Sequence, residues 1–231
     1  MVDHVYCINL ERSADRRKSA QIQFDREGLD VEFFKATDGK REAPDNIFLT
    51  KPEWGCAMSH VRIWRDIVDR GYEVTLVFED DIELKPEFLQ KLNKVLTQLP
   101  EDWDFVNIGT NSPLRIDYAD YTDDIKVGQS LTTHAYLIRL KCAQKLALID
   151  PNHLKDQIDT FMYRYPSYNL HVKDSLADQP LHHGTTIGFF RAHDYSFMFR
   201  KWWWLVLIVL CIVWLFLSRR KIWLKSLYTT K

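Results

Sequence analysis

Residues 74–81 constrain the fold of this chain more than any other segment. Residues 74–78 form a short apolar run rich in β-branched side chains, and three consecutive carboxylates follow it at Glu79, Asp80 and Asp81. Such a run, with no polar face, predicts a buried strand. Open α/β sheets bind their ligands beyond the carboxyl ends of their strands. The segment therefore predicts a sheet with acidic residues at its ligand-binding edge.

The three acids have two interpretations. Adjacent negative charges raise one another's pKa unless a cation lies near them. A hard divalent ion such as Mg²⁺ or Mn²⁺ relieves this repulsion through carboxylate oxygens and often brings a substrate phosphate with it. A solvated acidic turn gives the same pattern, because many strands end in aspartate. Residues 74–81 alone leave both interpretations open.

Strand and helix patterns alternate along the chain. The predicted strands are residues 5–8, 31–36, 74–78, 105–108, 131–140 and 170–172. The predicted helices are residues 14–27, capped by Ser13 and closed by Gly28, one that ends at Gly71, one opened by Pro86, and residues 141–149. Residues 40–52 and 109–124 are expected to be loops. This alternation predicts an α/β sandwich with a mostly parallel central sheet.

Charge and cysteine usage exclude several classes of protein. The formal net charge is −1, and residues 200–231 hold seven basic residues and no acid, so residues 1–199 carry −8. An acidic body argues against nucleic-acid binding, which needs a basic face. The four cysteines are far apart and form no CxxC pair. This spacing is neither a zinc motif nor a disulfide scaffold, and it fits a reducing compartment.

The C-terminal part of the chain predicts a membrane anchor. Residues 202–217 are an unbroken apolar run with basic residues on both sides and tryptophans suited to the interfacial belt. As a helix the run spans roughly 24 Å, and snorkelling Lys and Arg side chains can extend it towards a ~30 Å hydrocarbon core. We therefore expect a body at residues 1–199, a transmembrane helix with basic flanks at 200–221 and a short basic tail at 222–231.

The orientation of this anchor follows from two opposing signals. The positive-inside rule would put the basic tail in the cytoplasm. The N-terminal residues contain charges that interrupt any apolar signal-peptide core, so the body has no obvious route across a membrane. The simpler expectation is a single-pass C-terminal anchor with a body that faces the cytosol.

Three further clusters carry polar chemistry. Residues 8–17 (Ile-Asn-Leu-Glu-Arg-Ser-Ala-Asp-Arg-Arg) follow the first strand, where amide and guanidinium groups can hold a nucleotide. Residues 55–60 (Gly-Cys-Ala-Met-Ser-His) are expected at the start of a helix, which would attract anions. Residues 132–136 (Thr-Thr-His-Ala-Tyr) are the third. Each alone is better explained by a solvated helix start or by core packing than by ligand binding.

In combination, these segments resemble glycosyltransferase family 25, which includes lipopolysaccharide sugar transferases and collagen galactosyltransferases. The likeness rests on residues 8–12 with 15–17, Asp38-Gly39, residues 55–60 with Trp64, residues 78–82 and residues 135–138. Their order and spacing agree with the family, and the likeness extends over roughly the first 180 residues.

The resemblance implies a GT-A-type fold, a single Rossmann-like nucleotide-sugar domain. It also implies inverting transfer of a hexose from UDP-galactose or UDP-glucose to a hydroxyl of a glycan, glycolipid or protein. Asp81, with Glu79 or Asp80, is expected to hold Mn²⁺ (or Mg²⁺) against the donor diphosphate. The other expected donor contacts are made by Asn9, Arg12, Asp38, Glu79 and Asp80.

One further role follows from the resemblance, and a second, at a position where the chain departs from the family pattern, rests on GT-A folds in general. An inverting transfer needs a base for the acceptor hydroxyl, and Asp159 is the best match, with Asp156 as its competitor; either is also readily explained as a helix-surface acid. In many GT-A folds a C-terminal histidine completes the metal shell. His182 or His183 is expected to do so here, unless both are surface residues.

Two other function classes remain in view. One is a membrane-anchored nucleotide-sugar or glycan-binding module without turnover, against which the intact acidic triplet argues. The other is a metal-dependent phosphohydrolase, because acids at strand ends also serve phosphoryl transfer. The latter lacks a nucleophile motif and leaves the other clusters unexplained.

Overall fold

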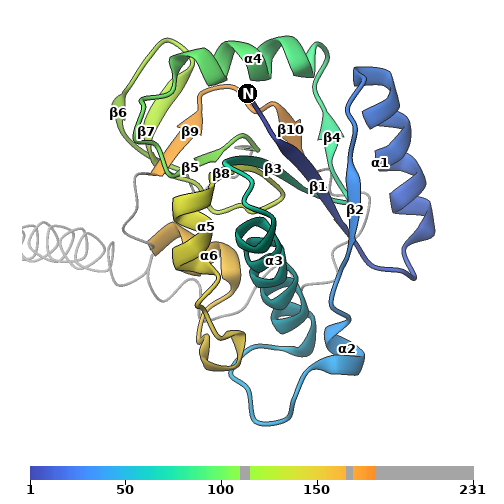
Figure 1. The fold of residues 1–231 in the computed structure, drawn as a ribbon. Coiled ribbons are helices and arrows are strands. Elements are labelled where there is room, and N and C mark those ends of the chain that lie inside the picture. Colours follow the sequence, from blue (N-terminus) through green and yellow to red (C-terminus); the bar gives the residue numbers. More distant parts are fainter. Residues whose placement is uncertain (110–114, 165–168, 180–231) are drawn as a thin grey trace, which may run out of the picture. The chain divides into compact units, whose positions relative to one another are not determined.

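An eight-stranded mixed sheet forms the centre of the computed structural model (Figure 1). The structure describes residues 1–109, 115–164 and 169–179, all of which belong to one unit of the chain, Met1–Gly184. In order across the sheet the strands are β2 (Glu32–Lys35), β1 (His4–Asn9), β3 (Val74–Glu79), β8 (Ala135–Arg139), β5 (Phe105–Asn107), β9 (Asn169–Val172), β7 (Ile125–Gln129) and β6 (Ile116–Asp120).

Most of these strands run in one direction. β1 pairs in parallel with β2 and β3, and β5 pairs in parallel with β9. β8 is antiparallel to β3 and β5, and β7 is antiparallel to β9 and β6. Six strands therefore point the same way, which agrees with the predicted mostly parallel sheet, and β8 and β7 are reversed. A small second sheet pairs β4 (Glu83–Leu84) with β10 (Ala177–Asp178).

Helices cover both faces of the sheet (Figure 1). α1 (Ala14–Glu27) and α4 (Phe88–Gln98) lie on one face. α3 (Lys51–Arg70), α5 (Leu140–Leu146) and α6 (Ile158–Arg164) lie on the other. The short helix α2 (Gly39–Glu42) and the 3₁₀ turn η1 (Pro151–His153) belong to connections.

Alternation along the strands divides the core into two halves. Val5 and Cys7 of β1 pack towards α1 and α4, whereas Tyr6 and Ile8 pack towards α3. β3 alternates in the same way, so successive residues belong to opposite cores. Burial of each large apolar side chain contributes about 1.5–3 kcal/mol. The continuous apolar run before Glu79 is therefore required, because both faces of this strand are covered.

Helix α3 begins earlier than its apolar spacing predicts. Thr50 and Glu53 form a capping box in which the Thr50 N–H donates to Glu53 Oε2 at 2.6 Å, and Pro52 is accommodated in the first turn. Residues 55–60 consequently lie inside the helix, where their backbone N–H groups make intrahelical bonds. The expectation that this segment is an anion-binding helix start is wrong.

Other local differences have similar causes. The expected loop 40–52 contains α2, and the expected loop 109–124 contains β6, whose described side chains are mostly exposed. A polar edge strand shows no apolar alternation, so its sequence carries no strand signal. β7 lies just before the strand predicted at residues 131–140, which is shortened to β8 in the structure. The helix predicted to open at Pro86 is α4, which begins at Phe88.

The predicted membrane helix at residues 200–221 lies outside the described residues, as does the tail at 222–231. Within residues 1–109, 115–164 and 169–179, no helix is both long enough and apolar enough to cross a bilayer.

Two glycines let α2 approach α3 closely. A Cβ on Gly55 would lie 2.7 Å from the Gly39 nitrogen and 2.8 Å from the Thr37 carbonyl oxygen, and a Cβ on Gly39 would overlap the Lys51 carbonyl. These are backbone atoms, which cannot move aside as a flexible side chain can. The contact fixes the segment containing Asp38 against the helix that carries Cys56 and His60.

We predict that Gly55→Ala destabilises the fold by about 1–3 kcal/mol, the usual cost of overpacking. In an unconstrained helix interior the same change stabilises by about 1 kcal/mol, so the sign of the effect is diagnostic. Chemical denaturation measures it. Gly28→Ala is the control for backbone strain without crowding. Gly28 has a φ of 69°, which disfavours any side chain, but open space surrounds the position of its Cβ. A Gly55→Ala variant more stable than the parent would contradict the close approach.

Candidate active site

The predicted nucleotide cluster and the acidic triplet meet at the carboxyl edge of β1 and β3. Asn9 is the last residue of β1, and Asp80 directly follows β3. Asn9 Nδ2 donates to Asp80 Oδ2 at 2.6 Å, although 71 residues separate the two positions. Both side chains are buried. The strand register therefore produces the convergence that the sequence predicts.

A guanidinium group lies between two of the three carboxylates. Arg16, in the first turn of α1, places Nη1 3.1 Å from Asp80 Oδ1 and 3.1 Å from Asp81 Oδ2. Gln179 Nε2 donates to the other oxygen of Asp81 at 3.0 Å. A cation thus already offsets the repulsion between adjacent acids, as electrostatics requires.

One guanidinium does not fully offset the cost of burying these acids. Burial raises the pKa of Asp81 to about 6, and the nearby Glu79 charge adds to this effect, whereas Gln179 and Arg16 oppose it. Burial also raises the pKa of Asp80 despite hydrogen bonds from Asn9 and Arg16. The pair therefore gains from additional positive charge, and its oxygen donors suit a hard divalent ion such as Mn²⁺ or Mg²⁺.

Glu79 interacts with a different set of residues. Its Oε1 accepts a hydrogen bond from Thr133 Oγ1 at 3.2 Å and faces His60 Nε2 at 3.4 Å. Burial alone would raise the pKa of Glu79, but the interactions with His60, His134 and Thr133 outweigh it and hold that pKa below its usual range. Glu79 is thus the one acid of the triplet whose pKa is lowered rather than raised.

The clusters at residues 55–60 and 132–136 are joined by hydrogen bonds next to Glu79. His60 Nδ1 lies 3.0 Å from the Tyr136 hydroxyl, which also accepts a hydrogen bond from Trp64 Nε1 at 3.1 Å. His60, Trp64 and Tyr136 are fully buried. This network holds the His60 ring in a single orientation that points towards Glu79.

Arg12 and Asp38 form an ion pair at the carboxyl edge of β1 and β2. Asp38 caps α2, because its Oδ1 accepts the Lys40 N–H at 3.1 Å. The hydrogen bond from Arg12 is the main reason that the pKa of Asp38 is below its ordinary value. Backbone pairing of Ala36 with Asn9 at 2.9 Å places this pair beside the end of β1. The three predicted donor-binding residues Asn9, Arg12 and Asp38 therefore line one edge.

Of the two candidate bases, Asp159 is the one whose charge acts on the Cys56 thiol. Gln157 Nε2 donates to Glu53 Oε1 at 2.6 Å and ties the start of α6 to α3. Burial raises the pKa of the Cys56 thiol, and the charges of Glu79 and then Asp159 add to this shift. Asp159 therefore sits on the Cys56 side of the site, whereas Asp156 pairs with Arg164. His182 and His183 lie outside the described residues.

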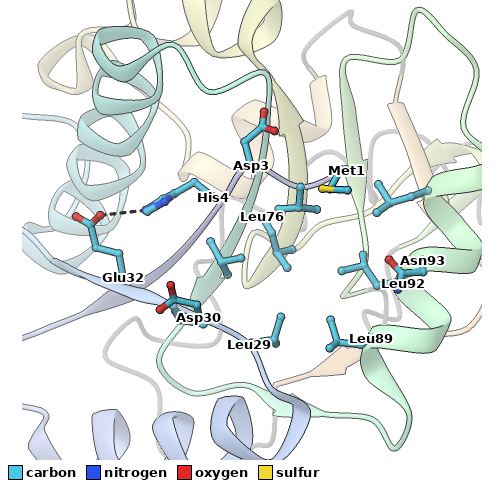
Figure 2. Close-up of a pocket in the computed structure, with 14 residues that line it drawn as sticks. Met1, Asp3, His4, Leu29, Asp30, Glu32, Leu76, Leu89, Leu92 and Asn93 are labelled. Carbon is cyan, nitrogen blue, oxygen red and sulfur yellow. Dashed lines mark hydrogen bonds and ion pairs between the residues drawn. The ribbon is translucent and has the colours of Figure 1, made fainter.

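A cavity lies at the opposite end of β1 and β3 from these residues. A cavity of about 570 Å³ opens at the amino end of β1 and β3, lined by apolar side chains of β3 and α4 such as Leu76, Leu89 and Leu92 (Figure 2). Its polar groups include Asp3 and the His4–Glu32 pair. Ligand sites of α/β sheets lie at the carboxyl ends of strands, so the size of this hollow does not identify it as the active site.

Three site residues were not predicted from the sequence. Arg16 was part of a recognised motif but had no assigned role, and nothing in the local sequence places it over Asp80 and Asp81. Thr133 belongs to the cluster at residues 132–136, and nothing in the sequence indicates that its partner is Glu79. Gln179 has no sequence signal, since it reaches Asp81 from 98 residues away.

We predict that Asp81→Asn changes stability in a pH-dependent way. Since folding raises the pKa of this carboxyl from its ordinary value to about 6, the folded state loses stability as pH rises from about 4 through 6. The variant lacks this penalty, so at pH 8 it should be about 1–3 kcal/mol more stable than the parent, with the gain vanishing near pH 4. Denaturant unfolding in chelator measures this. An equal loss of stability at every pH would contradict the raised pKa.

Comparisons with known proteins agree on the family. The family model described as "Glycosyltransferase family 25 (LPS biosynthesis protein)" matches residues 2–162. A "Glycosyltransferase 25 family member" of Aedes aegypti is 32% identical over 197 residues, which cover 75% of this chain and 32% of the relative. "Procollagen galactosyltransferase 2" of Homo sapiens is 28% identical over 186 residues, covering 69% of this chain and 30% of the relative. The chain thus spans about a third of the length of these relatives.

The fold is also found among solved structures. A glycosyltransferase involved in glycosylation of the major capsid of PBCV-1 matches with a TM-score of 0.50 and 10% identity, covering 84% of this chain and 97% of that chain. At this identity the likeness concerns the fold alone, a mixed α/β architecture resembling GT-A glycosyltransferases. On the match to the family model and the 32% identity, the chain belongs to glycosyltransferase family 25.

Proposed function

We propose that this protein is a metal-dependent, inverting glycosyltransferase that moves galactose or glucose from a UDP-sugar to an acceptor hydroxyl. The observation that carries the proposal is the convergence of the family motifs on one sheet edge, where Asn9 contacts Asp80 and Arg16 spans Asp80 and Asp81. Family membership supports the class of reaction. The finer assignments rest on the chemistry of these side chains.

The acidic pair supplies the site for Mn²⁺ or Mg²⁺. Asp81 is the primary ligand in this proposal, with Asp80 or Glu79 beside it, and His182 is the proposed C-terminal ligand. An ion bound there would neutralise charge on the UDP leaving group. Arg16, already 3.1 Å from both aspartates, is placed to contribute a second positive charge to the same diphosphate.

The proposed nucleotide contacts lie beside the metal ligands. Asn9 offers an amide, Arg12 a planar guanidinium, and Asp38 an acceptor for ribose hydroxyls. Arg12 and Asp38 pair with each other in the described structure, so the donor must share or replace that ion pair. A residue that stays charged, as Asp38 does through its lowered pKa, is suited to accept such hydrogen bonds.

Asp159 is the proposed general base for the acceptor hydroxyl. It belongs to α6 and its charge acts on the Cys56 thiol, whereas Arg16, the proposed diphosphate contact, pairs with Asp81. Inverting displacement requires the base and the leaving group on opposite faces of the sugar. The acceptor itself is a glycan, glycolipid or protein hydroxyl, since the family model is described as an LPS biosynthesis protein and one relative as a procollagen galactosyltransferase.

The predicted C-terminal anchor also leads to a proposal for where the protein is located in the cell. A single membrane-spanning helix at residues 200–221 would hold the catalytic body at a membrane surface facing the cytosol, close to a lipid-linked acceptor or a membrane-bound partner. Protease protection of the body in sealed vesicles, with and without detergent, tests this orientation.

We predict that the full-length protein releases UDP from UDP-galactose or UDP-glucose in the presence of Mn²⁺ and loses this activity in chelator. Asp81→Asn should lower turnover by about 10²-fold or more, because a metal ligand beside the leaving group is removed. A coupled UDP assay measures both. Asp104→Asn is the matched control, since Asp104 is also buried but pairs with Lys141 and Lys145 away from the site.

Two results would contradict the proposal. If neither UDP-sugar is bound or hydrolysed at any Mn²⁺ concentration, the donor assignment is wrong. If a UDP-sugar binds but is neither hydrolysed nor transferred to any member of a broad acceptor panel, the protein is a binding module.

Asp159→Asn tests the proposed base separately from donor binding. The variant should retain its affinity for the UDP-sugar and lose transfer. Loss of donor affinity would show that Asp159 is not the base.

A further inference from the structure

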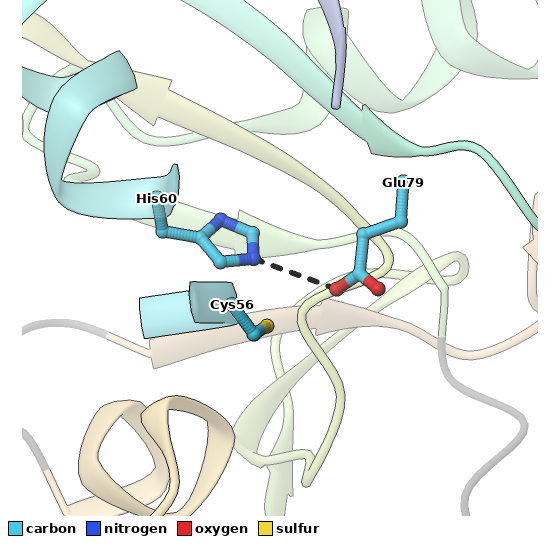
Figure 3. Close-up of side chains that lie close together, drawn as sticks. All are labelled: Cys56, His60 and Glu79. Carbon is cyan, nitrogen blue, oxygen red and sulfur yellow. Dashed lines mark ion pairs between the residues drawn. The ribbon is translucent and has the colours of Figure 1, made fainter. Parts of the chain in front are cut away.

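A thiol, an imidazole and a carboxylate converge in the interior of the site, and of the three only the carboxylate, Glu79, has a role in the proposed transfer. Cys56 and His60 are four residues apart on α3 and therefore project from the same face of the helix. Glu79 reaches towards them from the end of β3 (Figure 3). One potential ligand atom from each residue lies within 4.8 Å of the other two.

The His60 ring faces Glu79 on the side of this cluster but makes no hydrogen bond there among the described residues. His60 is fully buried, and among the described residues its Nε2 has no hydrogen-bond partner. The nearest acceptor, Glu79 Oε1, is 3.4 Å away, which is long for an N–H···O bond of about 2.9 Å. In a tetrahedral Zn²⁺ site, a histidine nitrogen and a carboxylate oxygen are separated by about 3.4 Å, given ligand distances of about 2.0–2.2 Å.

The surroundings supply the support that metal-binding histidines need. A ligating histidine donates its second ring N–H to a neighbouring group, which fixes its tautomer. The Tyr136 hydroxyl oxygen lies 3.0 Å from His60 Nδ1 and has two lone pairs, one for Trp64 Nε1 and one for Nδ1–H. Thr133 in turn holds Glu79 Oε1 at 3.2 Å. Both ligands are therefore oriented before any ion binds.

We propose that Cys56, His60 and Glu79 form a site for a borderline divalent cation of the Zn²⁺ class. Thiolate and imidazole ligands prefer such ions to Mg²⁺ or Mn²⁺, so the site is chemically distinct from the all-oxygen pair Asp80 and Asp81. Three protein ligands leave a fourth tetrahedral position for water or another group. Binding requires the Cys56 thiol to lose its proton as the metal–sulfur bond forms, and that proton passes to solvent.

This inference goes beyond the proposed function and does not depend on it. The linear spacing of the cysteines shows no zinc motif, because the ligands come from two elements that only the fold brings together. Glu79 belongs to both the acidic triplet and this site, so an ion bound here would withdraw one carboxylate from the triplet.

The test is titration of the reduced, metal-free full-length protein with Co²⁺, which reports tetrahedral geometry and thiolate ligation by absorption. We expect one thiolate-ligated, tetrahedral Co²⁺ per chain, seen as a thiolate-to-cobalt charge-transfer band, and loss of that band when Zn²⁺ displaces the cobalt. Cys56→Ala should abolish the band and weaken Zn²⁺ affinity at least about 10-fold. Cys142→Ala, which removes another buried thiol, should leave the band in place.

Asp81→Asn separates the two metal sites, because it should leave the cobalt band intact. Cys56 is only partly buried, so Cys56→Ala should fold, and an unchanged melting temperature of the metal-free variant verifies this. A Co²⁺ complex without a thiolate band, a band that survives in Cys56→Ala, or a band lost in Asp81→Asn would each overturn the proposal.

Discussion

The rest of the site is arranged around the repulsion among three carboxylates at the end of one buried strand. The apolar residues of β3 are covered on both faces, so Glu79, Asp80 and Asp81 leave the core together at its edge. Two of the acids share Arg16, while the third turns towards His60 and Thr133. This division gives the triplet two unlike environments, one of aspartate oxygens and a single guanidinium, the other lined by imidazole and thiol. A hard ion with its diphosphate suits the first environment, and a borderline ion suits the second.

The sequence predicted the parts of this arrangement that depend on strong local patterns. β1, α1 and β3 match their predicted residues closely, because apolar periodicity and the left-handed cap at Gly28 are unambiguous signals. The family was also recognisable from motif order. The carboxyl-edge position of Asn9, Arg12, Asp38 and the acids followed from the parallel pairing of β1, β2 and β3.

What the sequence could not predict depends on contacts between distant residues. The reversed strand β8 brings Thr133 and Tyr136 to Glu79 and His60, and no local pattern distinguishes a reversed buried strand from a parallel one. The bridging position of Arg16 depends on the packing of α1 against the sheet. The early start of α3 places Cys56 and His60 inside a helix rather than at its end, so the motif has no free backbone N–H groups for an anion and instead directs a thiol and an imidazole towards Glu79.

We propose that Asp81 and its neighbours form the metal-diphosphate site of a sugar-nucleotide transferase. The most direct test of this proposal is a crystal structure of the protein with UDP and Mn²⁺, using anomalous scattering to locate the manganese. The account predicts a manganese peak bonded to an Asp81 carboxylate oxygen and to diphosphate oxygens, with uracil and ribose beside Asn9, Arg12 and Asp38. A manganese peak away from Asp80 and Asp81, or UDP bound elsewhere on the molecule, would contradict it.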